Sequence, residues 1–479
     1  MKKILFSAVT IFSLFTAKAQ WIPQHPGFTR DTFGFYEMSL PDKNTVWAVC
    51  YDGKSPGLLS TRSILSFTRT VDAGATWIPG KVNTDQHLRF SNISAIDGQE
   101  AWVAMHKVGP VPSNYYGSFG KGGGVFHTID GGVTWEHTEP GELFNDNSVP
   151  RFVHFKDKNH GVAMGDPNGG YFEIYTTNNK GKKWKRVSQE KIPAPLGKEI
   201  GWISGYAVVG NTIWFGTDSG RMYKSIDFGK TWTVNRLDSL LGAYVHEIAF
   251  LDDGLTGVAH LRNATRTFVF STTDGGLTWT NYFQPPNCKN SRLTAVPGTH
   301  AFVSTSVHPN PLFTGSSVSY DAGKTWAHID QTAQKAVSRF FDATTGYAGG
   351  FYVSGHPVLS SRGIFKSTIQ FELPTAPTAS NSSSTPSGTM PTKLESDAML
   401  KVYPTPARAI INITLQNPSS STIQSLSLLS MDGKIMQARR ITGSSVEQLD
   451  VSKIPAGVYM LQVRMNNNQV ISKIITIAR

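Results

Sequence analysis

An eight-residue box recurs six times along this chain of 479 residues. It consists of Ser or Thr, any residue, Asp or Asn, any residue, Gly, two further residues and Trp. The copies are "TVDAGATW" (Thr70–Trp77), "TIDGGVTW" (Thr128–Trp135), "TNNKGKKW" (Thr177–Trp184), "SIDFGKTW" (Ser225–Trp232), "TTDGGLTW" (Thr272–Trp279) and "SYDAGKTW" (Ser319–Trp326). Their tryptophans lie 58, 49, 48, 47 and 47 residues apart. A period near 48 residues indicates a propeller or another repeat array.

The same order of strands is predicted before each box. In "EIAFLDDGLTGVAHL" (residues 247–261) a hydrophobic strand, a turn and a second strand follow one another, and a third strand then leads into the box. Apolar and polar residues alternate with period two, which is typical of strands. This preamble occurs seven times, although the box occurs six times. The pattern predicts an all-β fold whose main part is a seven-bladed β-propeller.

The seventh unit lacks its own fourth strand. It runs through "GIFKSTIQFEL" (Gly363–Leu373) without reaching a tryptophan, whereas "WIPQ" (Trp21–Gln24) resembles "WIPG" (Trp77–Gly80) after the first box. We therefore expect the N-terminal segment to supply the outer strand of the seventh sheet. This pairing would close the ring and cover a sheet edge that otherwise invites aggregation.

The box itself is interpreted as structural. Its acid can accept hydrogen bonds from turn amides, its glycine can adopt a positive φ, and its tryptophan can pack between neighbouring sheets. The positions assigned to this role are Asp72, Trp77, Asp130, Trp135, Asn179, Trp184, Asp227, Trp232, Asp274, Trp279, Asp321 and Trp326.

Residues 1–19 read as a secretory signal peptide, with Lys2 and Lys3 before an apolar stretch and a small-residue cleavage site at Ala17–Ala19. No later stretch is long enough for a transmembrane segment. The net charge of +11 is divided: the signal has three lysines, residues 374–479 have 10 basic and 5 acidic residues, and 20–373 keep 32 basic and 29 acidic ones. A main domain this close to neutral argues against nucleic acid as a partner.

The C-terminal part has a different composition. Residues 20–373 form the predicted propeller, residues 374–397 are a linker rich in Pro, Ser and Thr, and residues 398–479 form a second domain. Alternating segments such as "GVYMLQV" (Gly457–Val463) predict a small β-sandwich, similar to an Ig-like domain, and Asp432-Gly433 is a hairpin signal.

Residues 21–370 resemble the Asp-box (BNR-type) seven-bladed propellers, and among them the photosystem II stability/assembly factor-like proteins. The resemblance rests on the box, its period and the segment "GVAMGDPNGGYFEIYTTNNKGKKW" (Gly161–Trp184), in which Asn179 stands where the box acid is usual. Sialidases of the Asp-box group fit less well, because no Arg-Ile-Pro motif opens the chain.

The tail resembles the type A C-terminal sorting domain of the type IX secretion system. Four pieces occur in order: "VYPTPA" (Val402–Ala407), "LLSMDGKI", "LDVSKIPAGVYMLQV" (Leu449–Val463) and a final Lys473-Ile474; Thr405 replaces the usual Asn. The resemblance implies a bacterium of the Bacteroidota type, passage through the periplasm, and recognition of residues 398–479 by the type IX machinery. It further implies removal of the tail and a mature protein that is secreted or held at the cell surface.

A ligand site, if present, is expected on the face that carries the second-to-third strand loops and the connections between sheets, where the long irregular loops lie. We call this the loop face, and the opposite one the box-turn face. The candidate ligand-binding residues there are Tyr115, Tyr116, Arg151, Asp166, Asn168, Arg262, His308, Tyr352 and His356.

Two functions remain open. The chain offers no convincing acid–base pair, nucleophile, nucleotide motif or histidine cluster, so no catalytic residue, cofactor or metal is assigned. This favours a monomeric binding module for a glycan or surface protein over an enzyme. The alternative is a sialidase-like or other glycan-cleaving hydrolase, which would require guanidinium groups of three of Arg151, Arg262, Arg292 and Arg339 to converge on one pocket. Cys50 and Cys288 are expected to be unpaired.

Overall fold

The structure is a computed structural model that divides into two compact units, residues 1–374 and 375–479. The residues that it describes are 20–53, 65–84, 88–108, 119–139, 142–145, 147–237, 242–263, 266–308, 310, 313–352, 361–373, 400–404, 407–415, 422–430, 435–465 and 470–478. The predicted signal peptide and linker lie outside this part of the chain. Within it, no helix has the length and apolar character of a membrane span.

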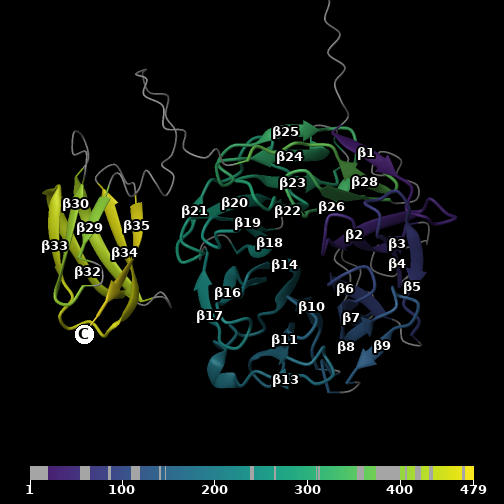
Figure 1. Cartoon of the computed structure of the whole chain (residues 1–479), viewed down its shortest axis with the longest axis horizontal. Coiled ribbons are helices and arrows are strands. Elements are labelled where there is room, and N and C mark those ends of the chain that lie inside the picture. Colours follow the sequence, from purple (N-terminus) through teal and green to yellow (C-terminus); the bar gives the residue numbers. More distant parts are fainter. Residues whose placement is uncertain are drawn as a thin grey trace, which may run out of the picture. The chain divides into compact units, whose positions relative to one another are not determined.

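Seven four-stranded antiparallel sheets make up the described part of the first unit, and Figure 1 shows them arranged in a ring. We number them as blades, each written from its innermost to its outermost strand. Blade 1 is β2 (Phe33–Ser39), β3 (Val46–Asp52), β4 (Ser66–Thr70) and β5 (Ile78–Lys81); blade 2 is β6 (Leu88–Ala95), β7 (Ala101–Val108), β8 (Phe119–Thr128) and β9 (Glu136–Thr138); blade 3 is β10 (Pro150–Phe155), β11 (Gly161–Pro167), β12 (Phe172–Thr177) and β13 (Lys185–Arg186).

The remaining blades follow the same order. Blade 4 is β14 (Gly201–Val209), β15 (Thr212–Thr217), β16 (Arg221–Ser225) and β17 (Thr233–Arg236); blade 5 is β18 (Tyr244–Phe250), β19 (Gly257–Arg262), β20 (Thr267–Thr272) and β21 (Thr280–Asn281); blade 6 is β22 (Arg292–Ala295), β23 (Phe302–Ser306), β24 (Gly315–Ser319) and β25 (Ala327–Asp330); blade 7 is β26 (Lys335–Phe340), β27 (Gly346–Gly350), β28 (Ile364–Ser367) and β1 (Trp21–Gln24). One short 3-10 helix, η2 (Gln189–Lys191), precedes blade 4.

The ring is closed by the N-terminal strand, as the sequence predicted. β1 pairs antiparallel with β28, and Trp21 lies opposite Ser367. Each innermost strand contacts the innermost strands of both neighbouring blades, including β26 with β2. The seven-bladed propeller is therefore complete, and its seventh blade combines the two ends of the domain (Figure 1).

A buried polar network anchors the closing strand. The indole Nε1 of Trp21 donates to Ser316 Oγ (3.0 Å), and Ser316 Oγ donates to Asp330 Oδ1 (2.7 Å). The ammonium group of Lys335 donates to the other oxygen of Asp330 (2.7 Å). The Lys335 side chain is 0% exposed, and its Nζ lies 5.5 Å from the centroid of the Trp21 ring. Burial lowers the pKa of Lys335, while Asp330 opposes that effect.

One tryptophan from an outer strand packs into each of the seven interfaces between blades. Seven hydrophobic clusters correspond to these interfaces. Trp77, Trp135, Trp184, Trp232, Trp279 and Trp326 come from the boxes, and Trp21 takes the same part between blades 6 and 7. The tryptophans thus join successive blades and bury large apolar surfaces there.

The box turns share one hydrogen-bond pattern. In blade 5 the hydroxyl of Thr272 donates to Asp274 Oδ1 (2.7 Å), and the hydroxyl of Thr278 donates to Oδ2 (2.6 Å). The corresponding acid and threonine pairs are Asp72–Thr76, Asp130–Thr134, Asp227–Thr231 and Asp321–Thr325. In the blade 3 box Lys183 replaces the threonine, and Asn179 Oδ1 accepts the Lys183 amide (3.0 Å). The five boxes that have an Asp therefore also have a Thr whose hydroxyl donates to the second carboxylate oxygen, and the box that has an Asn lacks this Thr.

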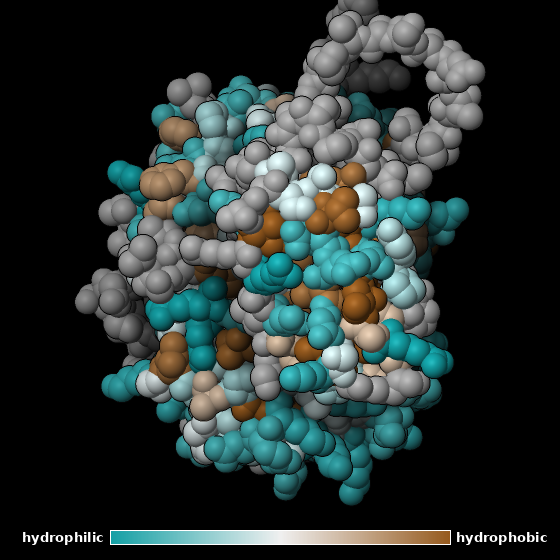
Figure 2. Space-filling view, turned by 90° about the vertical axis from the view of Figure 1, so that its left-hand side faces the viewer, coloured by the Kyte–Doolittle hydropathy of each residue, from teal (hydrophilic) through white to brown (hydrophobic). Residues whose placement is uncertain are grey.

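The second unit is a β-sandwich, as predicted. Its sheets are β29 (Leu400–Tyr403), β30 (Ile410–Leu415) and β33 (Val446–Asp450), and β32 (Ile435–Ser444), β31 (Ile423–Ser430), β34 (Gly457–Met465) and β35 (Val470–Ile477). Residues of both sheets, including Ile413 and Leu461, share one hydrophobic cluster. Hydrophobic and hydrophilic side chains are interspersed on the face that Figure 2 views. The predicted Asp432-Gly433 turn lies outside the described residues.

Candidate functional site

The innermost strands are irregular near the loop face, where each of them begins. In five blades the pairing of the first and second strands shifts by one residue at the same place, which is a β-bulge. The extra residues are Tyr36, Ser91, Arg151, His246 and Ala336. Blade 4 has a longer irregularity between Gly201 and Tyr206. Because a bulge re-aims side chains and interrupts pairing, this region presents polar and aromatic groups that a regular strand would not.

Side chains from the innermost strands meet in an axial cluster, which we define as Glu37, Tyr206, Glu247, Arg292 and Arg339. Arg339 Nη2 donates to Glu37 Oε1 (2.6 Å), and Arg292 Nη1 donates to Glu247 Oε1 (2.8 Å). Both glutamate side chains are 2% exposed. Burial alone would lower the pKa of Arg339, but Glu37, Tyr206 and Glu247 together outweigh burial and the pKa is raised. Burial raises the pKa of Tyr206 to about 12.

The axial cluster braces the ring across blades. Its ion pairs join blade 1 to blade 7 and blade 5 to blade 6, and Arg292 Nη2 also donates to the carbonyl of Tyr36 in blade 1 (2.8 Å). Asn92 in blade 2 donates to the Tyr206 hydroxyl (3.0 Å). Each charge in the cluster has an opposite partner, so these arginines are engaged within the protein.

Arg151 and Asp166, two of the predicted ligand-binding residues, form a buried ion pair in blade 3. Arg151 Nε donates to Asp166 Oδ1 (2.8 Å), and Nη2 donates to Oδ2 (2.5 Å). The Arg151 side chain is 2% exposed. Asp166 Oδ1 also accepts the amide of Gly201, at the start of blade 4 (3.1 Å). The ion pair therefore fixes the junction of blades 3 and 4. The positions of the two residues in the sequence did not indicate this pairing.

The other predicted site residues lie in separate blades. Asn168 donates from Nδ2 to Glu173 in blade 3, and Arg262 ends the second strand of blade 5. His308 follows β23, and its amide donates to Gln334. Tyr352 lies after β27, where the Arg362 guanidinium is 5.2 Å from its ring. Tyr115, Tyr116 and His356 lie outside the described residues.

An aromatic group that the sequence analysis missed lies at the entrance to blades 4 and 5. We define it as Trp202, Tyr244 and His246. The rings of Trp202 and Tyr244 are 4.3 Å apart between centroids, and Trp202 Nε1 donates to His246 Nδ1 (3.2 Å). Burial, with Arg292 and Arg262 nearby, holds the pKa of His246 well below its usual value, so its imidazole is neutral at pH 7. Tyr244 is the register partner of Arg262.

The three members of this aromatic group are half-buried. The available sequence signals were "GW" at residues 201–202, which the sequence placed in a connection between sheets, and "YVHE" at residues 244–247, which leads into a predicted first strand. Half-buried aromatic rings can pack against the apolar faces of sugars or peptides.

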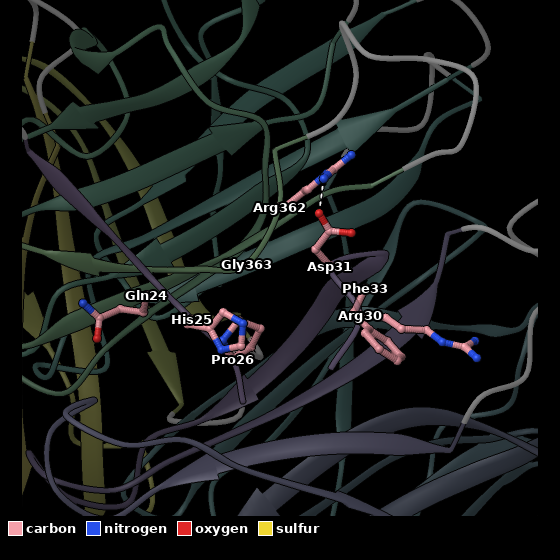
Figure 3. Close-up of a pocket in the computed structure, with 8 residues that line it drawn as sticks. All are labelled: Gln24, His25, Pro26, Arg30, Asp31, Phe33, Arg362 and Gly363. Carbon is pink, nitrogen blue, oxygen red and sulfur yellow. Dashed lines mark hydrogen bonds and ion pairs between the residues drawn. The ribbon is translucent and has the colours of Figure 1, made fainter. Parts of the chain in front are cut away.

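A pocket of about 140 Å³ lies at the seam between blade 7 and blade 1 (Figure 3). It is lined by Gln24, His25, Pro26, Arg30, Asp31, Phe33, Arg362 and Gly363. Arg362 forms an exposed ion pair with Asp31, which is the dashed contact in the figure. Ligand pockets usually measure about 300–1,000 Å³. This pocket can hold a few heavy atoms, and it is a weaker candidate than the aromatic group.

The described residues contain no cluster of three or more His, Cys, Asp or Glu side chains that could hold a metal ion. Cys50 and Cys288 are both free, as the sequence suggested. Burial raises the pKa of the Cys288 thiol to about 12, so the nearby His260 does not make it a nucleophile.

Comparisons with known proteins agree with both predicted resemblances. Residues 401–477 match the family described as secretion system C-terminal sorting domain. The photosystem II stability/assembly factor HCF136, chloroplastic, of Oryza sativa subsp. japonica is 27% identical over 147 residues, which is 30% of each chain. The present chain thus aligns with about 30% of the length of that relative. A sorting domain of this kind indicates export to the cell surface or beyond it.

Two solved structures are also similar. YCF48 from Cyanidioschyzon merolae has 16% identity and a TM-score of 0.49, and the match covers 73% of this chain and 98% of that one. The GH74 enzyme of Niastella koreensis has 12% identity and a TM-score of 0.46, with 94% and 79% covered. The assignment of the propeller fold rests on the seven sheets described above.

Proposed function

We propose that this protein is an exported propeller that binds a ligand on its loop face, where blades 4 and 5 begin. The sorting domain supplies the export part of the proposal. The propeller supplies the binding part, although a fold of this type hosts many functions and does not by itself select one. The site therefore has to be argued from its residues.

The half-buried pair of Trp202 and Tyr244 is the observation that carries the proposal. The two rings contact each other at the beginning of two innermost strands, and Arg262 ends the strand beside them. Aromatic side chains of this kind are frequent anchors in binding sites because they bury a large surface at a small entropic cost. A glycan or a peptide of a surface protein would present a complementary apolar face.

Maturation and export complete the proposed function. The signal peptide, residues 1–19, would be removed after Ala19, and residues 374–397 would separate the propeller from the tail. The type IX secretion machinery would recognise residues 398–479 and carry the protein across the outer membrane. The mature protein would act as a monomer in the medium or on the cell surface.

Glycan cleavage is the alternative, and the arginines bear on it. A sialidase-like site requires several guanidinium groups open to one substrate carboxylate. Arg151, Arg292 and Arg339 are each paired with a carboxylate of this protein. We therefore favour binding, with turnover of a glycan as the result that would reverse this choice.

Binding on glycan and surface-protein arrays tests the proposal, with the chain from Gln20 to Arg479 and a fluorogenic glycosidase panel alongside. Trp202→Ala and Tyr244→Ala should each weaken binding about tenfold or more, because each removes an aromatic anchor worth more than about 1.4 kcal/mol. Tyr320→Ala is the matched control, since Tyr320 is an exposed aromatic residue in a box turn on the opposite face. Binding that all three variants retain would place the site elsewhere.

A further inference from the structure

Arg89, in the innermost strand of blade 2, carries a positive charge that the described residues do not neutralise. Its Nε and Nη2 atoms are buried and have no hydrogen-bond partner. No salt bridge to Arg89 is formed within the described part of the chain. Burial lowers the pKa of Arg89, which reflects the cost of holding the charge there, while Tyr36 opposes this effect. Buried cations are normally paired, so this exception needs an explanation.

The two empty donors form one edge of the guanidinium group. Nε and Nη2 together make the side-on fork that binds both oxygens of a carboxylate. Arg151 uses this same edge for Asp166, with contacts of 2.8 and 2.5 Å. Arg221 also presents Nε and Nη2 to Glu199 in blade 4. The protein thus fills this fork with a carboxylate twice and leaves it empty at Arg89.

The register explains why blade 2 has no carboxylate of its own at this place. In blade 3, Asp166 follows Gly165, which lies opposite Pro150 at the bulge. In blade 2 the corresponding pair is Phe90 and Met105, so Ser91 and His106 occupy the positions of Arg151 and Asp166, and His106 is the register partner of Arg89. His106 Nδ1 instead meets the hydroxyl of Ser91 (2.9 Å). Burial holds the pKa of His106 to about 3, so it is neutral and offers Arg89 no charge.

We infer that Arg89 is the anchor for a carboxylate group of the ligand that binds the loop face. This inference rests on the proposed function for the position of the site, and it adds the chemical class of the ligand. Arg89 lies near the loop-face end of its strand, and the residue as a whole is partly exposed, although Nε and Nη2 themselves are buried. Tyr36 is close enough to influence its charge and supplies an aromatic neighbour.

A carboxylate could come from a sugar acid or from the end of a peptide. Both present the same planar group with two oxygens, and a bidentate contact would satisfy both empty donors at once. D-glucuronate and N-acetylglycine represent the two sources, and glucose and N-acetylglycinamide are their neutral counterparts. Equal concentrations of sodium chloride control for ionic strength.

Thermal unfolding of the chain from Gln20 to Arg479 tests the inference, with and without each compound. At least one carboxylate should raise the Tm of the wild type, whereas its neutral counterpart and chloride should not. Arg89→Met should abolish this shift and leave the Tm of the free protein unchanged or higher, because it removes a buried unpaired charge. Arg89→Lys should weaken the shift, because lysine keeps the charge but lacks the fork.

Arg292→Met is the matched control, since Arg292 is paired with Glu247 and its loss should lower the Tm. The inference is overturned if Arg89→Met lowers the Tm as Arg292→Met does, if Arg89→Met fails to fold, or if the carboxylate shift persists in Arg89→Met. Array ligands that bind Arg89→Met as well as the wild type would overturn the inference and leave the proposed function standing. A carboxylate-induced Tm shift that depends on Arg89, together with array binding that Trp202→Ala does not weaken, would support the inference and overturn the proposed function.

Discussion

Six blades of the propeller consist of four strands that are consecutive in the sequence. The outer strand of the seventh blade is β1, from the N-terminal end of the domain. In blade 5, the box turn after β20 leads directly into β21, and Trp279 donates from Nε1 to Gly276 within the same turn (3.2 Å). In blade 7, Trp21 makes its indole contact with Ser316, which is 295 residues away. The same packing position is therefore reached by a local route and by a distant one.

The comparison of blade 7 with the other six blades shows which feature of a blade is needed to close the ring. Blade 7 has no box, yet a tryptophan fills its interface with blade 6. What replaces the box is the network of Ser316, Asp330 and Lys335 beneath the strand. The packing of the tryptophan is thus common to all blades, while the polar contacts that position it differ.

Removing the closing strand should have the largest effect. Deletion of Gln20–Gln24 removes the pairing with β28 and the buried Trp21, and we expect a loss of more than about 5 kcal/mol, which is comparable to the whole stability of many domains. Trp21→Ala alone should cost about 3–5 kcal/mol. Chemical denaturation followed by tryptophan fluorescence measures both. Trp326→Ala, in a blade with a box, is the control, and an equal loss for deletion and control would remove the distinction between the two kinds of blade.

Breaking the buried ion pair beneath the strand should come next. Asp330→Ala leaves the fully buried Lys335 without its partner and should cost about 3–5 kcal/mol. Lys335→Met removes the charge itself, and we expect a much smaller change. The two variants are compared by denaturation at pH 7. Equal losses would mean that the lysine acts through packing rather than through its charge.

Lowering the pH should reduce the free energy of unfolding through buried histidines in blades that have boxes. The closing strand β1 should not add to this effect. Burial holds the pKa of His106 near 3 and that of His260 near 4, below the value of about 6.5 in the unfolded chain. The unfolded state therefore binds more protons, and stability is full above pH 6.5 and falls as the pH drops towards 4. At pH 5.5 the two groups together should cost about 3 kcal/mol. They lie in blades 2 and 5.

The measurement is the free energy of unfolding of wild type and Trp21→Ala from pH 7.5 to 5.5. Both curves should fall with the same slope, because the substitution changes neither histidine. A steeper fall of the unfolding free energy in Trp21→Ala would show that the closing strand β1 and the buried histidines are coupled. The tail contains no histidine, so its own unfolding should change little over this range.

The smallest effect is expected at single boxes. Asp274→Ala removes contacts to two hydroxyl groups and to turn amides, and should cost about 1–2 kcal/mol. Asn179→Ala should cost less, because Lys183 supplies no hydroxyl in that box. Asn179→Asp should change stability by less than about 0.5 kcal/mol. Thermal unfolding of the three variants tests this order, and a gain from Asn179→Asp would contradict it.

Much of the fold followed from the sequence because its signals are periodic. The spacing of the box tryptophans predicted a propeller, the seven preambles predicted the number of sheets, and the likeness of Trp21–Gln24 to Trp77–Gly80 predicted the closure. These signals are local patterns repeated along the chain, and each needs the same residue types in every copy. The sandwich was predicted too, although strands such as β33 were missed because their alternation is weak.

The candidate site was less predictable, because it depends on contacts between blades. Asp166 and Arg151 were both named as ligand residues, but nothing in their spacing of 15 residues showed that they bind each other. The bulges that turn Tyr36 and His246 have no sequence signature of their own. Arg89 was not predicted as a site residue. Its importance depends on the residue opposite it, because His106 lies there and provides no carboxylate.

The long reach of β1 has a consequence for the order of folding. Bringing residues about 300 apart together costs on the order of 5 kcal/mol of chain entropy, and this cost must be met before the final contacts form. Contacts so remote along the chain make folding slow. A polypeptide that crosses a membrane from its N-terminus would hold Trp21 ready from the start, yet it could finish its circle only after Ser367 had emerged. Until then, the edge of β28 that pairs with β1 would stay open.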